Sequence, residues 1–172
     1  MKHLLILSIV ISALALGCTP PAPPTPVTLT QIDVQLYAGA GVTGTLTIEV
    51  RNTTGATPAL WSTTVDTGDF PAVYSWYSCS VPDLTLYSGR TYRIYMTRSD
   101  SHDLTAANTI TWRSTLGVVD EYPQLKSSGG THDFVFKTYI DGVINQSVEP
   151  TDIYGYSVYS TDYWWQEFVP VE

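Results

Sequence analysis

The most distinctive chemistry in this sequence is an aromatic run between Asp152 and Phe168. It holds seven aromatic residues in seventeen positions: Tyr154, Tyr156, Tyr159, Tyr163, Trp164, Trp165 and Phe168. Flat rings stack on sugar faces and tyrosine hydroxyls form hydrogen bonds, so Tyr163, Trp164 and Trp165 are candidate ligand-binding residues. The alternation of Tyr154, Tyr156 and Val158 favours an edge strand that packs on the rest of the domain. Both roles are compatible, because consecutive residues such as Trp164 and Trp165 point to opposite faces of a strand.

A second candidate site is the polar segment from Ser99 to Asn108, which contains Asp100 and Asp103. Crowded carboxylates on a loop can bind Ca²⁺, but the EF-hand pattern is absent, since neither its glycine nor its final glutamate follows Asp100 at the required spacing. Turn capping by the aspartate side chains is the alternative. We therefore expect no cofactor, with Ca²⁺ at Asp100 and Asp103 as the one exception left open.

A third candidate is the long connection from Ser114 to Thr131, which contains Asp120-Glu121-Tyr122-Pro123. Connections of this length usually carry a function or are disordered. Tyr122 is the residue of this segment most suited to contact a ligand.

Signatures of catalysis are missing from the sequence. Asp120 and Glu121 are adjacent and would face opposite sides of a strand, so they do not form a glycosidase pair. His102 and His132 are not accompanied by a Gly-x-Ser-x-Gly motif, and the sequence has no HExxH, CxxC or phosphate-binding glycine loop. We expect a protein that is not an enzyme.

The first residues of the chain have the composition of an export signal. Lys2 and His3 precede a mostly apolar run, Leu4 to Leu16, which is too short to span a bilayer stably. Residues 1–17 are therefore expected to be a signal peptide.

The sequence Leu14-Ala15-Leu16-Gly17-Cys18 resembles the lipobox of bacterial lipoproteins. The resemblance implies cleavage before Cys18, lipidation of Cys18, and attachment to a membrane on its extracytoplasmic side, at the cell surface or in the periplasm. An ordinary secretory signal is the alternative. Five prolines between Thr19 and Pro26 predict an extended spacer, so residues 18–26 form a lipidated linker.

If Cys18 carries lipid, Cys79 is the only other cysteine and no internal disulfide can form. Cys79 lies in an alternating run and is expected to be a small buried hydrophobic residue. The chain has 8 basic and 16 acidic residues in 172, a formal net charge of −8, so nucleic acid is not an expected partner.

The strongest structural pattern lies between Leu84 and Met96. Two alternating runs flank Ser88-Gly89, which predicts a β-hairpin with one apolar face. A one-sided hairpin requires a second layer of strands over that face.

Similar alternating runs recur along the chain, separated by turn residues such as Gly39-Ala40-Gly41 and Thr67-Gly68-Asp69. The runs are centred on residues 32–36, 46–50, 60–65, 77–81, 109–113 and 133–139. With the two runs above they predict about eight strands and an all-β, two-sheet antiparallel sandwich. We expect this domain to span 27–139 and an aromatic-rich extension, 140–172, to pack on it.

The segments Leu84 to Tyr95 and Asp133 to Tyr139 resemble strands of the jelly-roll-like sandwich modules of secreted prokaryotic surface proteins, which include carbohydrate-binding modules. The resemblance implies a binding or adhesive role, possible glycan partners, and no particular binding residue. The alternative is a structural lipoprotein that contacts an envelope protein. The first hypothesis predicts exposed aromatic rings, and the second predicts rings buried in the domain or against a protein.

Overall fold

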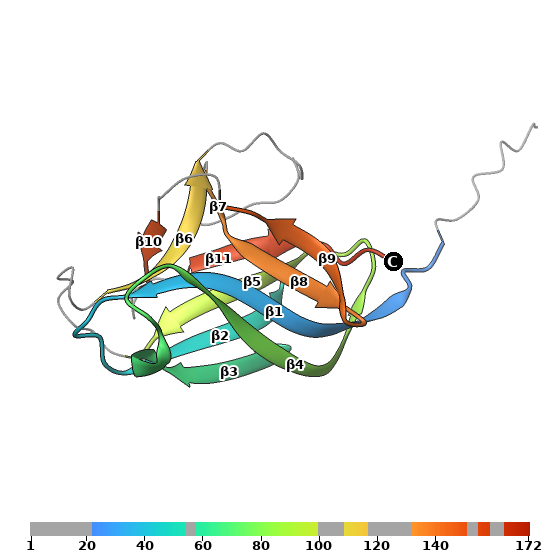
Figure 1. The fold of residues 1–172 in the computed structure, drawn as a ribbon. Helices are drawn as coiled ribbons and strands as arrows, with labels where there is room; N and C mark the ends of the chain where they lie inside the picture. The colour runs from blue at the N-terminus through green and yellow to red at the C-terminus, as the bar shows by residue number, and fades with distance from the viewer. Residues whose placement is uncertain (1–21, 54–57, 100–108, 117–131, 151–154, 159–163) are drawn as a thin grey trace, which may run out of the picture.

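A computed structural model of the chain describes residues 22–53, 58–99, 109–116, 132–150, 155–158 and 164–172. These residues form antiparallel strands in two packed layers (Figure 1). The elements are β1 (Pro26–Ala38), β2 (Thr45–Asn52), β3 (Trp61–Asp66), the 3₁₀ turn η1 (Thr67–Asp69), β4 (Ser75–Tyr87), β5 (Tyr92–Arg98), β6 (Ile110–Leu116), β7 (His132–Phe134), β8 (Phe136–Ile140), β9 (Val143–Val148), β10 (Gly155–Ser157) and β11 (Trp164–Phe168). The prediction of a two-sheet antiparallel β-sandwich is confirmed.

Strand β1 is the centre of the larger, seven-stranded sheet. The main order is β10-β6-β1-β8-β9, with β4 also paired to β1 and β7 to β6. β1 is long enough to pair with β4 along most of its length and with β8 and then β6 on its other side. A bulge between Leu29 and Gln31 shifts both registers at once. The second sheet has the order β11-β5-β2-β3.

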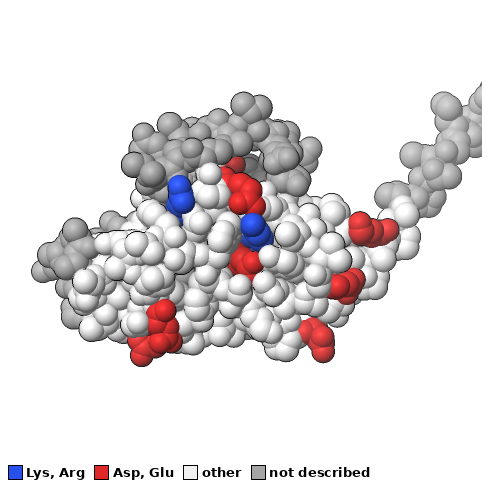
Figure 2. Space-filling view, in the orientation of Figure 1, with Lys and Arg blue, Asp and Glu red and all other residues white. Residues whose placement is uncertain are grey.

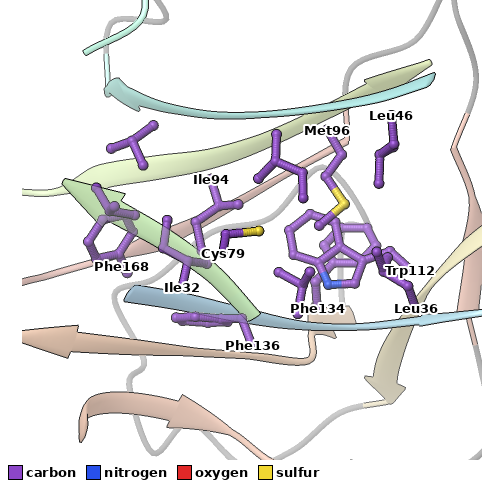
Figure 3. Close-up of a cluster of buried hydrophobic side chains, with 14 of the residues drawn as sticks. Ile32, Leu36, Leu46, Cys79, Ile94, Met96, Trp112, Phe134, Phe136 and Phe168 are labelled. Carbon is purple, nitrogen blue, oxygen red and sulfur yellow. The ribbon is translucent and has the colours of Figure 1, made fainter. Parts of the chain in front are cut away.

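The core lies between the two sheets and follows from the period-two patterns. Ile32, Val34 and Leu36 of β1 are buried, as is Ile48 of β2. Figure 3 shows Ile32 and Leu36 facing inward residues of the second sheet, among them Leu46 of β2 and Met96 of β5. Within the core, Trp112 stacks on Phe134, with ring centroids 4.3 Å apart. The Trp112 indole N–H also donates to the Val135 carbonyl at 3.0 Å, so this buried polar group is paired.

The prediction of a hairpin between Leu84 and Met96 is wrong, although the inward faces are correct. β4 pairs with β1 in the larger sheet, whereas β5 pairs with β2 and β11 in the smaller one. The turn around Gly89, whose φ is +71°, therefore carries the chain from one sheet to the other. Leu86 and Ile94 are both fully buried, but they belong to opposite layers. Alternation of apolar residues predicts which face of a strand is buried, but it does not identify the strand to which it hydrogen-bonds.

The predicted strand from Asp133 to Tyr139 is divided at Val135. β7 pairs with β6, and β8 pairs with β1 and β9. The Val135 N–H donates to the Arg113 carbonyl at 2.9 Å, and the Val135 carbonyl accepts from the Gln35 N–H at 3.3 Å. The break therefore leaves the backbone of Val135 hydrogen-bonded.

The sheets continue past Tyr139, where the sequence suggested that the sandwich ends. β8 and β9 form a hairpin through Asp141-Gly142, both with positive φ, as expected for a tight two-residue turn. β10 joins β6, and β11 forms the edge of the smaller sheet beside β5. Residues 140–172 thus supply strands to both layers. Without them, β5 and β6 would each present an open edge.

The predicted signal peptide, Cys18 and the start of the proline-rich segment lie outside the described residues, and residues 22–25 have no regular secondary structure. Within the described ranges, no helix has the length and apolar character needed to cross a membrane.

Candidate ligand-binding face

The outer surface of the seven-stranded sheet carries an aromatic ring among polar side chains. Tyr77, Cys79 and Val81 of β4 point toward the core, so the alternating Trp76 and Ser78 point outward. Trp76 lies opposite Gln35 of β1 and is 36% exposed. We use the name Trp76 face for Trp76 and the polar side chains around it on this outer surface: Asp33, Gln35, Arg113, Lys137, Tyr139 and Glu149.

Asp33 is the buried acidic group of this face, with 7% exposure. Its two carboxylate oxygens accept hydrogen bonds from the Gln31 amide and the Tyr139 hydroxyl, each at 2.7 Å. The hydrogen bond to Asp33, with smaller contributions from burial and nearby charge, raises the pKa of Tyr139 to about 12. Tyr139 therefore keeps its hydroxyl proton at neutral pH, and its hydrogen bond to Asp33 fixes the tyrosine ring in place.

Lys137 links Trp76 to Glu149. Its ammonium lies 4.5 Å from the centre of the Trp76 ring and 2.8 Å from Glu149 Oε1. The hydrogen bond from Lys137, together with one from Ser147, lowers the pKa of Glu149 despite partial burial. Lys137 thus orients both an aromatic ring and an ionised carboxylate on the same face.

A second basic residue borders the face on the side of β6. Arg113 donates from Nη1 to Gln35 Oε1 at 2.9 Å, and its guanidinium lies 5.3 Å from the centre of the Tyr74 ring. Burial raises the pKa of Tyr74, while Arg113 opposes the increase. The Tyr74 and Tyr37 rings are 5.8 Å apart, so aromatic groups continue along this border.

Figure 2 shows this side of the molecule. Basic and acidic atoms lie next to each other over the middle of the sheet, and further acidic groups occupy its periphery. The centre of the face is therefore a mixed array of donors and acceptors, which is suited to a polar ligand with many hydroxyl groups.

Trp164 and Trp165, two of the three residues predicted as a platform, lie on β11 of the smaller sheet, away from the Trp76 face. Trp164 packs against the core and contacts Phe134 edge to face at 5.7 Å. Trp165 lies on the outer surface, where the Arg93 guanidinium stacks over its ring at 3.9 Å and also pairs with Glu167 at 2.9 Å. The two tryptophans do point to opposite faces, as their adjacency requires. Trp165 is less exposed than Trp76, and Arg93 lies closer to its ring than Lys137 lies to the Trp76 ring, so Trp165 is the less open of the two to sugar stacking.

The other predicted site residues cannot be placed on either face. Cys18, Asp100, Asp103, Tyr122 and Tyr163 all lie outside the described residues. Among the residues that are described, no group of three or more His, Cys, Asp or Glu side chains could hold a metal ion.

Cys79 is buried on the inner side of β4, as the alternating pattern predicts. Burial, together with the negative charge of Asp33, raises the pKa of its thiol to about 12. The thiol is therefore protonated at neutral pH and is a poor nucleophile.

The residues of the Trp76 face were not identified from the sequence as a site. They come from four strands, β1, β4, β6 and β8, and from Glu149 just after β9. Asp33 and Glu149 are 116 positions apart in the sequence, so no local motif joins the face. One signal was present: in the run that follows Tyr74, Trp76 alternates with the inward Tyr77 and Cys79, which predicts a tryptophan on the outer surface.

The chain matches no protein-family model, and comparisons with curated proteins and with solved structures also found no match. The assignment of a function therefore depends on the geometry described above.

Proposed function

We propose that this chain is an exported lipoprotein, anchored through Cys18, whose β-sandwich binds a carbohydrate without catalysing its conversion. The observation that carries the proposal is the partly exposed Trp76 ring, flanked by Lys137 and by the hydrogen-bonded side chains of Asp33 and Gln35. A sugar presents an apolar face of C–H groups and a rim of hydroxyls. The ring suits the first, and the surrounding amide, carboxylate and ammonium groups suit the second.

The state of the acidic groups supports binding in preference to hydrolysis. A glycosidase requires one carboxyl group that holds a proton at neutral pH. Lys137 lowers the pKa of Glu149 instead, and both oxygens of Asp33 accept hydrogen bonds from neutral donors. Neither residue has the surroundings of a general acid.

A structural role in the cell envelope is the second candidate. It is favoured by the C-terminal aromatics, because Trp164 packs on the core and Phe168 is fully buried. In this account the tail completes the smaller sheet, and the exported domain contacts an envelope protein through a surface other than the C-terminal rings.

The binding proposal is tested by screening the full chain on a glycan array and repeating the screen with Trp76→Ala. Retention of a glycan by the native chain and its loss by the variant would support a carbohydrate site on this face. If the native chain binds no glycan but captures a defined envelope protein, the structural role is the correct one.

The anchor is tested separately. In an expressing bacterium, labelled fatty acid should be incorporated into the native chain, and Cys18→Ser should abolish the incorporation because it removes the thiol that carries the lipid. Equal incorporation in both proteins would contradict lipidation at Cys18.

A further inference from the structure

Exposed apolar side chains gather at the end of the sandwich where β1 begins. Among the described residues, seven large hydrophobic side chains are exposed, and five of them lie at this end: Leu60, Tyr87, Val143, Ile144 and Val171. We call these five residues the apolar end. Such clustering on one end of a domain marks a contact surface more often than scattered exposure does.

Backbone pairing places these residues together. Tyr87 lies opposite Pro26, the first residue of β1. Ile140 lies opposite Leu29, near the same end of β1, and the two-residue turn after Ile140 leads to Val143. The Asn145 side chain donates to the Val171 carbonyl at 3.0 Å, which holds the final residues beside this hairpin.

Leu60 is connected to the same end through the smaller sheet. The Leu60 N–H donates to the Val50 carbonyl at 2.8 Å. Asn52, two residues after Val50 on β2, lies opposite Tyr92 of β5. The Tyr92 hydroxyl accepts a hydrogen bond from the Tyr87 N–H at 3.0 Å. Both sheets therefore contribute to the apolar end.

Val143, Ile144 and Val171 also line one open pocket, together with Ile140, Asp141, Asn145 and Glu172. Val143 is 70% exposed, so its side chain is available for contact. The surface is thus a shallow apolar depression with acidic groups at its rim.

The chain leaves the domain at this same end toward Cys18. Thr25 is fixed there, since its N–H donates to Ser88 Oγ at 3.2 Å and its carbonyl accepts from the Ser88 N–H at 2.8 Å. Six residues lie between Cys18 and Thr25, so the two are seven positions apart. At about 3.1 Å per residue for a proline-rich segment, the lipid attachment point lies within roughly 20 Å of the apolar end.

We propose that the apolar end rests on the bilayer into which the Cys18 lipid inserts. This inference depends on the lipid anchor of the proposed function and adds a defined orientation to it. The short linker limits the distance to the bilayer, and the apolar side chains stabilise contact with its interfacial region. β1 runs away from this end, so the Trp76 face stands upright beside the membrane and stays open to ligand (Figure 1).

Charge further specifies the lipid. Asp141 and Glu172 lie in the pocket lining, and Arg90 lies in the nearby turn after Tyr87. Basic clusters attract anionic lipids, whereas this surface has more acidic than basic groups around its pocket. The apolar end should therefore bind more strongly to bilayers with zwitterionic headgroups than to bilayers with anionic ones.

The test uses the lipidated full chain with one introduced cysteine carrying a nitroxide label, reconstituted in phosphatidylcholine vesicles. The variant is Val143→Cys, and the matched control is Val73→Cys. Val73 has similar exposure, 64%, but lies near the opposite end of β1, where the Pro71 carbonyl accepts from the Ala38 N–H. Cys79 is buried and should not be labelled.

The label at position 143 should be several-fold less accessible to a water-soluble nickel chelate than the label at position 73, and more accessible to oxygen. Added phosphatidylglycerol should reduce this protection at low salt. Equal accessibility of the two labels would overturn the proposal, and so would spin–spin coupling between labels at position 143, which would indicate contact with a second copy.

Mass spectrometry of the N-terminal peptide separates the two possible failures. Acyl chains on Cys18 combined with a water-exposed label at position 143 would overturn the membrane contact alone. Absence of acyl chains would overturn the anchor and, with it, this orientation.

Discussion

The side-chain carbonyl of Gln166 accepts a hydrogen bond from the backbone N–H of Phe134 at 2.8 Å, inside the sandwich. Gln166 lies on β11 of the smaller sheet and Phe134 on β7 of the larger, so this bond joins the two layers. Gln146 acts in a similar way, because its Oε1 accepts from the Val169 N–H at 3.0 Å. Two buried glutamines thus attach the C-terminal strand to the opposite sheet.

Replacing Gln166 with leucine should lower the free energy of unfolding by about 1–3 kcal/mol, because it removes a buried acceptor while keeping similar volume. Chemical denaturation measures the change. Thr64→Ala, at an exposed position of β3, is the control and should change stability by no more than about 0.5 kcal/mol. Equal effects of the two substitutions would show that the inter-sheet bond contributes little.

Trp164→Ala should destabilise the domain more than Trp165→Ala. Trp164 packs on the core, and loss of a large buried ring costs about 3–5 kcal/mol when burial is complete, so about 2–4 kcal/mol is expected here. Trp165 loses mainly its contact with Arg93, worth about 1 kcal/mol at a partly exposed site. Thermal and chemical unfolding of both variants would reveal the order, and the reverse order would contradict the assigned faces.

Tyr139→Phe tests the hydrogen bond to Asp33. The folded pKa of Tyr139 is raised from 10.0 to about 12, so the stabilisation by its hydroxyl is complete below pH 10 and is lost as the pH rises toward 12. The variant should be less stable by about 1 kcal/mol at neutral pH, and the difference should shrink over that alkaline range. Unfolding measured at several pH values tests this, with exposed Tyr87→Phe as the control. A difference that does not depend on pH would exclude the proposed pairing.

Neither reductant nor EDTA should shift the thermal midpoint. Cys79 is the single cysteine of the described residues, and those residues contain no cluster suited to a metal. Differential scanning calorimetry with and without each reagent measures the effect. A midpoint lowered by many degrees in EDTA would point to a bound cation, with Asp100 and Asp103 as the first ligands to replace.

Much of the fold could be predicted from the sequence, because period-two alternation identifies inward residues such as Ile32, Ile48 and Cys79 directly. Pairing could not be predicted in the same way. The apolar alternation around Leu86 and Ile94 would be the same whether their strands paired as a hairpin or belonged to two facing sheets. Only the pairing with distant strands distinguishes these arrangements.

One hairpin was predictable but was not recognised. Asp141-Gly142 follows the alternating strand Phe136 to Ile140, and Asp-Gly is among the strongest signals for a two-residue hairpin turn. The polar residues after it are typical of an edge strand that is open to solvent on one face, and they gave that segment the appearance of a loop.

The candidate site was less predictable than the fold. Lys137 and Glu149 lie near each other in sequence, but Asp33 and Trp76 reach them only through the pairing of β1 with β4 and β8. In addition, the density of aromatic residues drew attention to the C-terminal run, where Trp164 serves the core.

The central claim is tested most directly by calorimetric titration of a glycan identified on the array. The titration measures the affinity of the unmodified chain, of Trp76→Ala and of Trp165→Ala. Both substitutions remove an outward tryptophan, but from opposite sheets. Trp76→Ala should weaken binding by about 1–2 kcal/mol, roughly 5- to 30-fold, while Trp165→Ala should leave affinity unchanged. Unchanged affinity in Trp76→Ala, or a selective loss in Trp165→Ala, would contradict a binding site on the Trp76 face.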